Sequence, residues 1–269
     1  MIPDKHGTYQ IDPNEYSREY FLTACDGFET FKECQGTNLP PRLKAIWNLL
    51  DTKPGMKLLD LGCGRGEIII QCGLNQIHGV GLDYSKDAIA LANKSVQQII
   101  NLPKVNVIKP NLLLADIKQL PFLNNSFECV LMSDLVEHLN PNELNLGLNE
   151  VWRVLSSGGR LLIHTMPNLW YYQFGYPLFR LVRKINGENL PRDPRKRHQF
   201  PHVHINEQTP RSLRKALNRI GFKRITVWLF DYHDYHQHSR VMKRMMRLFA
   251  RSPLIKYIFN NDIFAIAEK

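Results

Sequence analysis

The sequence predicts an α/β fold built on a doubly wound, mostly parallel sheet of seven strands. Its 269 residues are enough for one such domain with additional segments. Short apolar patterns typical of buried strands alternate with longer patterns of helical period, which favours parallel strands joined by helices. A glycine-rich turn at residues 62–66 connects the first of these strands to a helix.

Seven segments have the length and apolar composition of strands. In chain order they are residues 56–61, 77–83, a strand beginning near Val105, 128–134, 160–167, 223–230 and 262–269. Helical periodicity marks residues 41–50, the segment after the glycine-rich turn, 85–100, 142–155 and 210–220. Ser85 is the expected N-cap of its helix, and Gly158-Gly159 and Gly221 are expected to end theirs.

The chain divides into a cap and a main domain. Residues 1–40 are irregular and rich in aromatic side chains, and we expect them to form an N-terminal cap. Residues 41–269 carry the alternation of strands and helices, which is interrupted at 168–205 and 231–260. The first interruption is aromatic, basic and proline-containing, so we interpret it as a lid, and the second as a further insertion before the last strand.

Charge is distributed unevenly along the chain. Residues 151–269 contain 22 Lys and Arg against 7 Asp and Glu, whereas residues 1–150 contain 13 against 18. A basic half is typical of proteins that bind an anionic substrate, nucleic acid or a membrane surface, and it is equally compatible with a solvated surface that binds none of these.

The sequence predicts a cytoplasmic location. Five cysteines without a Cys-x-x-Cys pair indicate neither a disulfide framework nor a zinc site. No apolar run approaches the roughly 18 residues of a membrane span, and the polar N-terminus lacks the apolar core of a signal peptide. A peripheral position on the inner face of the membrane is a second expectation, based on the basic segment 240–258.

The glycine-rich turn predicts a ligand site. Residues 60–66 read Asp-Leu-Gly-Cys-Gly-Arg-Gly, and glycines at alternating positions permit positive φ and let a bulky ligand approach the backbone. The free N–H groups of the helix that follows favour the anionic end of a ligand. The third glycine comes one residue earlier than in the dinucleotide pattern, which disfavours NAD.

Acidic residues follow the next two predicted strands. Asp83 ends the second strand, where an ionised carboxylate can accept both hydrogen bonds of a ribose diol, and the neighbouring Tyr84 can stack on adenine. Asp116, after the third strand, can accept a hydrogen bond from the adenine amino group. Each Asp alone could cap a helix or lie in a surface loop, but three at successive strand ends indicate a nucleoside-containing cofactor.

Together these segments resemble the motifs of class I S-adenosylmethionine-dependent methyltransferases, in the small-molecule branch that includes ubiquinone-type and phosphobase enzymes. The resemblance covers residues 43–167, with a weaker likeness in 209–227. The segments that carry it are LLDLGCGRGE (58–67), GLDYS (81–85), ADIKQLPF (115–122), SFECVLMSDLVEHL (126–139) and LNEVWRVLSSGGRLLIHTMPN (148–168).

The resemblance implies a Rossmann-like methyltransferase fold, S-adenosylmethionine as cofactor and a small-molecule methyl acceptor. It assigns the methionyl end of the cofactor to Asp60 and the backbone of Gly62, Cys63 and Gly64. The ribose, adenine and methyl ends are assigned to Asp83, to Asp116 with Ile117, and to Ser133. About eleven residues separate Val105 from Asp116, which indicates either a bulge in the third strand or a different position for Asp116.

His138 is the first candidate for a general base, because an imidazole can accept a proton at neutral pH. In phosphobase relatives a His in this register works with an N-terminal Tyr, for which Tyr20 or Tyr16 is the candidate here. The alternative is that Glu137 and His138 only frame the pocket.

In the segment 198–204, His202 is a second catalytic candidate. The three histidines of that segment lack further metal ligands, so no metal is expected, and His164 is interpreted as structural.

The end of the fourth predicted strand indicates the kind of methyl acceptor. The fourth strand ends in Ser-Asp-Leu-Val-Glu-His and not in the Asn/Asp-Pro-Pro-Tyr/Phe of base-methylating enzymes, and Cys129 is not followed by the proline of a cytosine C5 nucleophile. We therefore expect methyl transfer to oxygen or nitrogen of a small molecule that is anionic, lipid-like or related to glycans or natural products. An RNA methyltransferase, favoured only by charge, and a non-catalytic cofactor-binding subunit are the alternatives.

The two insertions have their own pattern. Residues 169–185 mix aromatic side chains with Arg and Lys, and residues 240–258 have the pattern of a basic amphipathic helix. Such a helix packs on the sheet edge with a solvated basic face, covers a hydrophobic or phosphate-bearing substrate, or attaches to an anionic membrane. The pattern alone leaves these three alternatives open.

Overall fold

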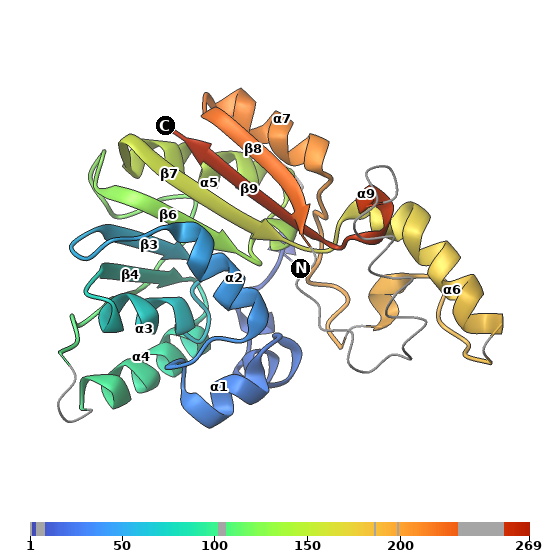
Figure 1. Ribbon diagram of the computed structural model, residues 1–269, viewed down its shortest axis with the longest axis horizontal. Helices are drawn as coiled ribbons and strands as arrows, with labels where there is room; N and C mark the ends of the chain where they lie inside the picture. The colour runs from blue at the N-terminus through green and yellow to red at the C-terminus, as the bar shows by residue number, and fades with distance from the viewer. Residues whose placement is uncertain (1, 4–8, 102–105, 186, 198, 231–255) are drawn as a thin grey trace.

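A computed structural model describes residues 2–3, 9–101, 106–185, 187–197, 199–230 and 256–269. Seven strands form one sheet in the order β5-β4-β3-β6-β7-β9-β8 (Figure 1). They are β3 (Lys57–Leu61), β4 (His78–Asp83), β5 (Asn111–Leu114), β6 (Phe127–Ser133), β7 (Leu155–Thr165), β8 (Lys223–Phe230) and β9 (Asp262–Glu268). Strand β9 runs antiparallel to β7 and β8, and the other paired strands of this sheet are parallel. The predicted mostly parallel, seven-stranded sheet is confirmed.

Helices cover both faces of the sheet, as a doubly wound fold requires (Figure 1). Helices α2, α3 and α4 pack on one face, and α5 and α7 on the other. The helices are α1 (Phe28–Cys34), α2 (Pro41–Leu50), α3 (Glu67–Leu74), α4 (Lys86–Ile100), α5 (Pro141–Val154), α6 (Tyr176–Ile185), α7 (Pro210–Ile220) and α9 (Lys256–Phe259). A separate two-stranded sheet pairs β1 (Ile2–Pro3) with β2 (Tyr9–Gln10).

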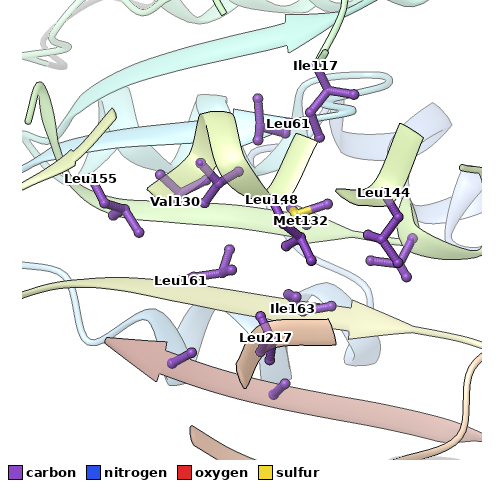
Figure 2. Close-up of a cluster of buried hydrophobic side chains, with 14 of the residues drawn as sticks. Leu61, Ile117, Val130, Met132, Leu144, Leu148, Leu155, Leu161, Ile163 and Leu217 are labelled. Atoms are coloured by element: carbon purple, nitrogen blue, oxygen red, sulfur yellow. The ribbon is translucent and has the colours of Figure 1, made fainter. Parts of the chain in front are cut away.

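Alternating side chains of the central strands build two hydrophobic cores. Leu59 and Leu61 of β3 face α5 and α7, whereas Leu58 faces α2 and α3. Figure 2 shows the first of these cores, with Leu148 of α5 among side chains of β6 and β7. Because both faces are apolar, the strands are nearly continuous hydrophobic runs, which is typical of buried parallel sheets.

Three predicted helix boundaries are confirmed by their caps. The Ser85 hydroxyl accepts a hydrogen bond from the Ala88 N–H at 3.2 Å, which makes Ser85 the N-cap of α4. Pro41 begins α2 at a position where its missing N–H costs nothing. Gly221 ends α7 in the left-handed conformation, with φ of 105°.

Two predicted boundaries are wrong. Strand β5 begins at Asn111 and not near Val105, so the extra residues precede the strand, and Asp116 lies two residues beyond its end. Helix α5 ends at Val154, and Gly158-Gly159 lies inside β7, where the pairing with β6 shifts register. Glycine pairs mark irregular strands as well as helix ends, because both need positive φ.

The N-terminal segment is more regular than predicted and is fixed by one buried arginine. It forms a π-helical turn at Tyr20–Ala24 and the helix α1. The Arg65 guanidinium donates hydrogen bonds to the carbonyl oxygens of Phe21, Cys25 and Asp26 and pairs with Glu67 at 2.8 Å. Since Arg65 belongs to the glycine-rich turn, the N-terminal segment is held against that turn.

The first insertion lies beside the sheet and contains α6 (Figure 1). A π-helical turn at Tyr171–Gly175 leads into α6 and packs against α9. Gly175 approaches the carbonyl oxygen of Ile258 so closely that no side chain would fit there. Of the second insertion, residues 231–255 lie outside the described residues, and most of the helix predicted at 240–258 lies there. None of the helices in the described ranges has the length and apolar character needed to cross a bilayer.

The strand order places a ligand site at one edge of the sheet. From β3 the chain moves to β4 and β5 on one side, and then to β6 and β7 on the other. At such a switch point the connections after the strands separate and leave a crevice at the carboxyl ends. The ends of β3, β4 and β6 meet there.

Leu148→Ala is expected to lower the free energy of unfolding by about 2–5 kcal/mol, because Leu148 is fully buried in the core between α5 and the sheet. Leu146 lies on the same helix and is 41% exposed. Leu146→Ala is therefore the matched control and should change stability by less than about 0.5 kcal/mol. Urea unfolding followed by circular dichroism measures both, and equal losses would contradict this assignment of the core.

Candidate active site

A cavity of about 460 Å³ lies at the carboxyl ends of β3, β4 and β6. Its volume is within the range of small-molecule sites. All nine residues predicted to contact the cofactor line it: Asp60, Gly62, Cys63, Gly64, Asp83, Tyr84, Asp116, Ile117 and Ser133. Two other segments complete its walls, the N-terminal cap and the insertion at 168–205.

The glycine-rich turn forms the floor of the cavity. Gly62 and Gly64 have φ of 72° and 51°, a region that side-chain-bearing residues adopt rarely. The N–H groups of Gly62 and Cys63 donate to the Leu82 carbonyl oxygen at 2.8 and 3.0 Å, which fixes the turn to β4. At Gly62 and Gly64 the turn therefore presents backbone without a side chain to the cavity.

Two buried carboxyl groups lie beside this turn. Burial and the neighbouring Glu67 and Asp83 raise the pKa of Asp60 to about 8. Burial raises the pKa of Asp83 to about 6, although its carboxylate accepts hydrogen bonds from the N–H groups of Gly64 and Ser85 at 3.0 and 2.9 Å. A ligand that brings positive charge or hydroxyl donors would stabilise both ionised forms.

The segment after β5 forms a further part of the cavity wall. The Asp116 carboxylate accepts a hydrogen bond from the Lys118 N–H at 2.9 Å and pairs with the Lys118 ammonium at 3.1 Å. Ile117 is buried and supplies an apolar surface. Ser133, at the end of β6, donates to the Asp134 carboxylate at 3.2 Å.

These residues fit S-adenosylmethionine. The acids Asp60 and Asp83 match the ammonium and hydroxyl donors of its methionyl and ribose parts, since both parts need acceptors. Tyr84 and Ile117 offer flat and apolar surfaces to a purine. The positively charged sulfonium also suits a cavity lined by eight Asp and Glu residues against four Arg and Lys.

Another part of the cavity wall is aromatic and contains two histidines. Tyr16, Tyr20 and Phe200 line it, and the Tyr16 ring lies edge-on to His138 with centroids 5.5 Å apart. The rings of His138 and His204 are 4.9 Å apart. The predicted candidates His138 and Tyr20 are thus in the wall of the same cavity as the cofactor residues.

The environment of His138 fixes its tautomer and its charge. Its Nδ1 lies 2.9 Å from the Val203 carbonyl oxygen, and a carbonyl can only accept, so Nδ1 carries the proton. The Nε2 lone pair is then available as a proton acceptor. Burial lowers the pKa of His138 to about 4, so the ring is neutral at physiological pH.

His202, the second catalytic candidate, is outside the cavity. It is exposed, and its Nε2 lies 2.9 Å from the Glu15 carboxylate. His204, two residues later, lines the cavity instead. His198 lies outside the described residues. The segment 198–204 thus lines the cavity through His204 and not through His202. Which side chains of an irregular segment face a cavity could not be predicted from the sequence.

Glu137 connects the insertion to the sheet. Its carboxylate accepts hydrogen bonds from the Thr165 hydroxyl at 2.7 Å and the Met166 N–H at 3.4 Å. Its carbonyl oxygen accepts from the N–H groups of Ile205 and Asn206 at 2.9 and 3.0 Å. Burial and the nearby Asp134 raise the pKa of Glu137 to about 8. Its contacts make Glu137 a framing residue, which agrees with one alternative from the sequence.

One group of side chains in the described ranges has the spacing of a metal site. Possible ligand atoms of Glu137, His138 and His204 lie within 4.8 Å of one another. The Glu137 carboxylate already accepts from Thr165, and the Nδ1 of His138 faces Val203. The sequence predicts no metal, and this geometry equally suits a proton-accepting site.

A chain of charged side chains that starts in the cavity wall was not predicted as a unit. His164 lies between the carboxylates of Asp134, 2.9 Å from Nδ1, and Asp262, 3.0 Å from Nε2, and Arg42 pairs with Asp134 at 3.1 Å. Burial opposes the charge, but the two carboxylates outweigh it and raise the pKa of His164 to about 9. Arg42 and His164 together hold the pKa of Asp134 well below its usual range despite burial. The position of Asp134 at a strand end was the available indication.

Residues 59–163 match the protein family described as "Methyltransferase domain". The chain is 27% identical over 157 residues to the cyclopropane-fatty-acyl-phospholipid synthase of Escherichia coli, which covers 58% of this chain and 36% of that enzyme. It is 27% identical over 151 residues to the demethylmenaquinone methyltransferase of Bacillus cereus, covering 54% and 60%. The chain therefore spans between about a third and three fifths of the length of these two relatives.

Solved structures show the same fold. Phosphoethanolamine N-methyltransferase 2 of Haemonchus contortus superposes with a TM-score of 0.62 at 16% identity, over 96% of this chain and 61% of that one. A SAM-dependent methyltransferase of Methanosarcina mazei gives 0.55 at 20%, over 86% and 98%. Residues 59–163 thus carry a methyltransferase domain, and the seven-stranded sheet has the Rossmann-like fold of class I S-adenosylmethionine-dependent methyltransferases. S-adenosylmethionine is the cofactor of this class.

His164 is expected to titrate near pH 9, because its protonated ring bridges two carboxylates. Its ordinary pKa is 6.5, so its contribution to the free energy of unfolding is complete below pH 6.5 and lost as pH rises through about 9. The stability difference between the wild type and His164→Asn should therefore shrink over this range. NMR titration of the imidazole gives the pKa directly, and a midpoint near 6.5 would contradict the bridging arrangement.

Asp83→Asn is expected to weaken S-adenosylmethionine binding about 10- to 100-fold, the effect of losing a charged hydrogen-bond acceptor. Affinity in the wild type should also fall as pH is lowered through 8 and 6, because Asp60 and Asp83 become protonated there. Calorimetric titration measures both effects. The control is Asp193→Asn, because Asp193 does not line the cavity. Thermal unfolding of each variant checks that the protein stays folded.

Proposed function

We propose that the chain transfers the methyl group of S-adenosylmethionine to an oxygen or nitrogen atom of a small molecule with an apolar body and an anionic group. The observation that carries the proposal is the continuity of the cavity. The cavity is lined by the glycine-rich turn with Asp60 and Asp83 and by a second group of residues, the acceptor wall, that contains His138, Tyr20 and His204. An acceptor bound at this wall would share the cavity with the methyl donor.

Bound S-adenosylmethionine supplies an electrophilic methyl carbon, to which the acceptor lone pair bonds while the carbon–sulfur electrons stay on sulfur. The chain must position the acceptor and receive its proton. His138 is our candidate proton acceptor, because the Val203 carbonyl oxygen holds the proton on Nδ1 and leaves the Nε2 lone pair to accept. Tyr20 and Phe200, whose ring centroids are 5.3 Å apart, give this part of the wall an aromatic surface.

The composition of the acceptor wall supports an apolar molecule that carries negative charge. Tyr16, Tyr20, Phe200 and Val203 provide apolar contact, and Arg197 of the insertion also lines the cavity. Among the similar proteins, one is named for fatty-acyl phospholipid and another for demethylmenaquinone. These names support acceptors with long apolar parts, and an anionic lipid-like molecule is the first class to test.

The test measures S-adenosylhomocysteine released by the full chain with a panel of acceptors. The panel contains acidic phospholipids, isoprenoid quinols, phosphobases, glycans and transfer RNA. Turnover with a lipid-like or otherwise small acceptor supports the proposal. Turnover with RNA alone, inhibited steeply by salt, would overturn it. EDTA should leave turnover unchanged, since the proposed chemistry uses no metal.

His138→Ala is expected to lower kcat by about 10²- to 10⁴-fold through loss of the proton acceptor. The dissociation constant of S-adenosylmethionine should stay within about twofold, because His138 lies on the acceptor wall. His202→Ala is the matched control and should keep wild-type kcat, since His202 pairs with Glu15 outside the cavity. At saturating cofactor, kcat should fall on the acid side only as pH approaches 4, where His138 becomes protonated. Loss of activity in the His202 variant alone would reverse the assignment.

A further inference from the structure

Helix α6 presents an apolar face to solvent. Four large side chains of the segment 174–185 are exposed: Phe174 by 57%, Leu178 by 46%, Leu181 by 56% and Ile185 by 78%. They are four, three and four residues apart, so they share one side of the helix. Single exposed leucines are common on protein surfaces, but four in one continuous row are not.

The opposite side of α6 is anchored, so this row has a fixed orientation. Tyr176 is buried, and its hydroxyl donates to the Pro191 carbonyl oxygen at 2.7 Å. The Arg197 guanidinium lies over the rings of Tyr176 and Phe179, 5.9 and 5.8 Å from their centroids. Arg180 donates to the Leu190 carbonyl oxygen at 3.1 Å. The helix packs on its own insertion with its inner side, whereas its outer row is exposed in the part of the chain that the structure describes.

The insertion that carries the apolar row has an excess of positive charge. Residues 169–205 contain seven Lys and Arg against two Asp and Glu. Lys184 on α6 is exposed, as are Arg192 and Lys196 in the following segment. The two acids are already paired, Glu188 with Arg183 at 2.7 Å and Asp193 with Arg195 at 3.2 Å. The charge available to a partner is therefore cationic.

We propose that the outer face of α6 docks on the surface of an anionic lipid bilayer. An apolar row that enters the interface, with Lys and Arg around it that meet lipid phosphates, is the arrangement of helices that lie in the plane of a membrane. The charge favours lipid over a second copy of this chain, because a second α6 would bring the same excess of cations to the contact. Figure 1 shows α6 at the edge of the molecule, away from the seven-stranded sheet, where a flat surface can reach it.

Docking through α6 would bring the insertion that lines part of the cavity to the bilayer. The same insertion supplies Arg197, Gln199, Phe200, Val203 and His204 to the cavity wall. The docking itself does not depend on the reaction. It can hold even if the acceptor proves to be water-soluble.

The experiment is co-sedimentation of the full chain with vesicles of equal parts phosphatidylglycerol and phosphatidylcholine. The double variant Leu181→Gln/Ile185→Gln keeps the net charge and should lower the vesicle partition coefficient at least tenfold, since each side chain loses its apolar burial. The control is Leu123→Gln, because Leu123 is 83% exposed on a turn far along the chain from α6. It should bind like the wild type.

Lys184→Gln should weaken binding about fivefold, and added salt should weaken wild-type binding. Vesicles of phosphatidylcholine alone should leave the chain in the supernatant. Equal binding of the wild type and the α6 double variant would overturn the proposal and assign any membrane contact to another segment. A failure of the wild type to bind would also overturn it. Dimerisation in sedimentation velocity that the double variant abolishes, without vesicle binding, would assign the face to a second copy.

Discussion

Parallel strands bring their carboxyl ends, and the turns that follow them, to the same edge of a sheet. In this chain β3, β4 and β6 do so side by side, with β3 in the middle. The two hydrogen bonds from the glycine-rich turn to the Leu82 carbonyl oxygen then join the first two of these ends directly. The shape of the cavity floor follows from this junction, because the turn can take its positive φ values only where glycine removes the side chain.

The cofactor half of the cavity could be predicted from the sequence because each of its residues lies within a few positions of a strand end. A strand pattern therefore locates Asp83 or Ser133 without knowledge of the rest of the fold. Even the wrong start of β5 left Asp116 in place, since the error fell before the strand. Gly158-Gly159 was predicted to end a helix, but it lies at a register shift in β7. The error left the site residues in place because it also fell away from the strand ends.

The acceptor half could be predicted only in part, because tertiary contacts position it. His138 follows a strand and was found, whereas the choice between His202 and His204 depends on how residues 199–206 cross the cavity. That crossing is fixed by hydrogen bonds from Ile205 and Asn206 to the Glu137 carbonyl oxygen, 68 and 69 positions away in sequence. No local pattern predicts such contacts. Arg42 pairs with Asp134 over 92 positions.

The hydrogen bonds of Arg65 have a consequence for how ligand and protein influence each other. Phe21 lies beside Gly64, and the carbonyl oxygens of the N-terminal segment are held by the arginine of the same turn. Ordering the turn therefore orders the cap, and by thermodynamic linkage the free energy of coupling is the same in both directions. A molecule bound at the turn is expected to protect residues 20–26 from proteolysis and hydrogen exchange. Removal of the N-terminal segment is expected to lower the affinity for that molecule by the same factor.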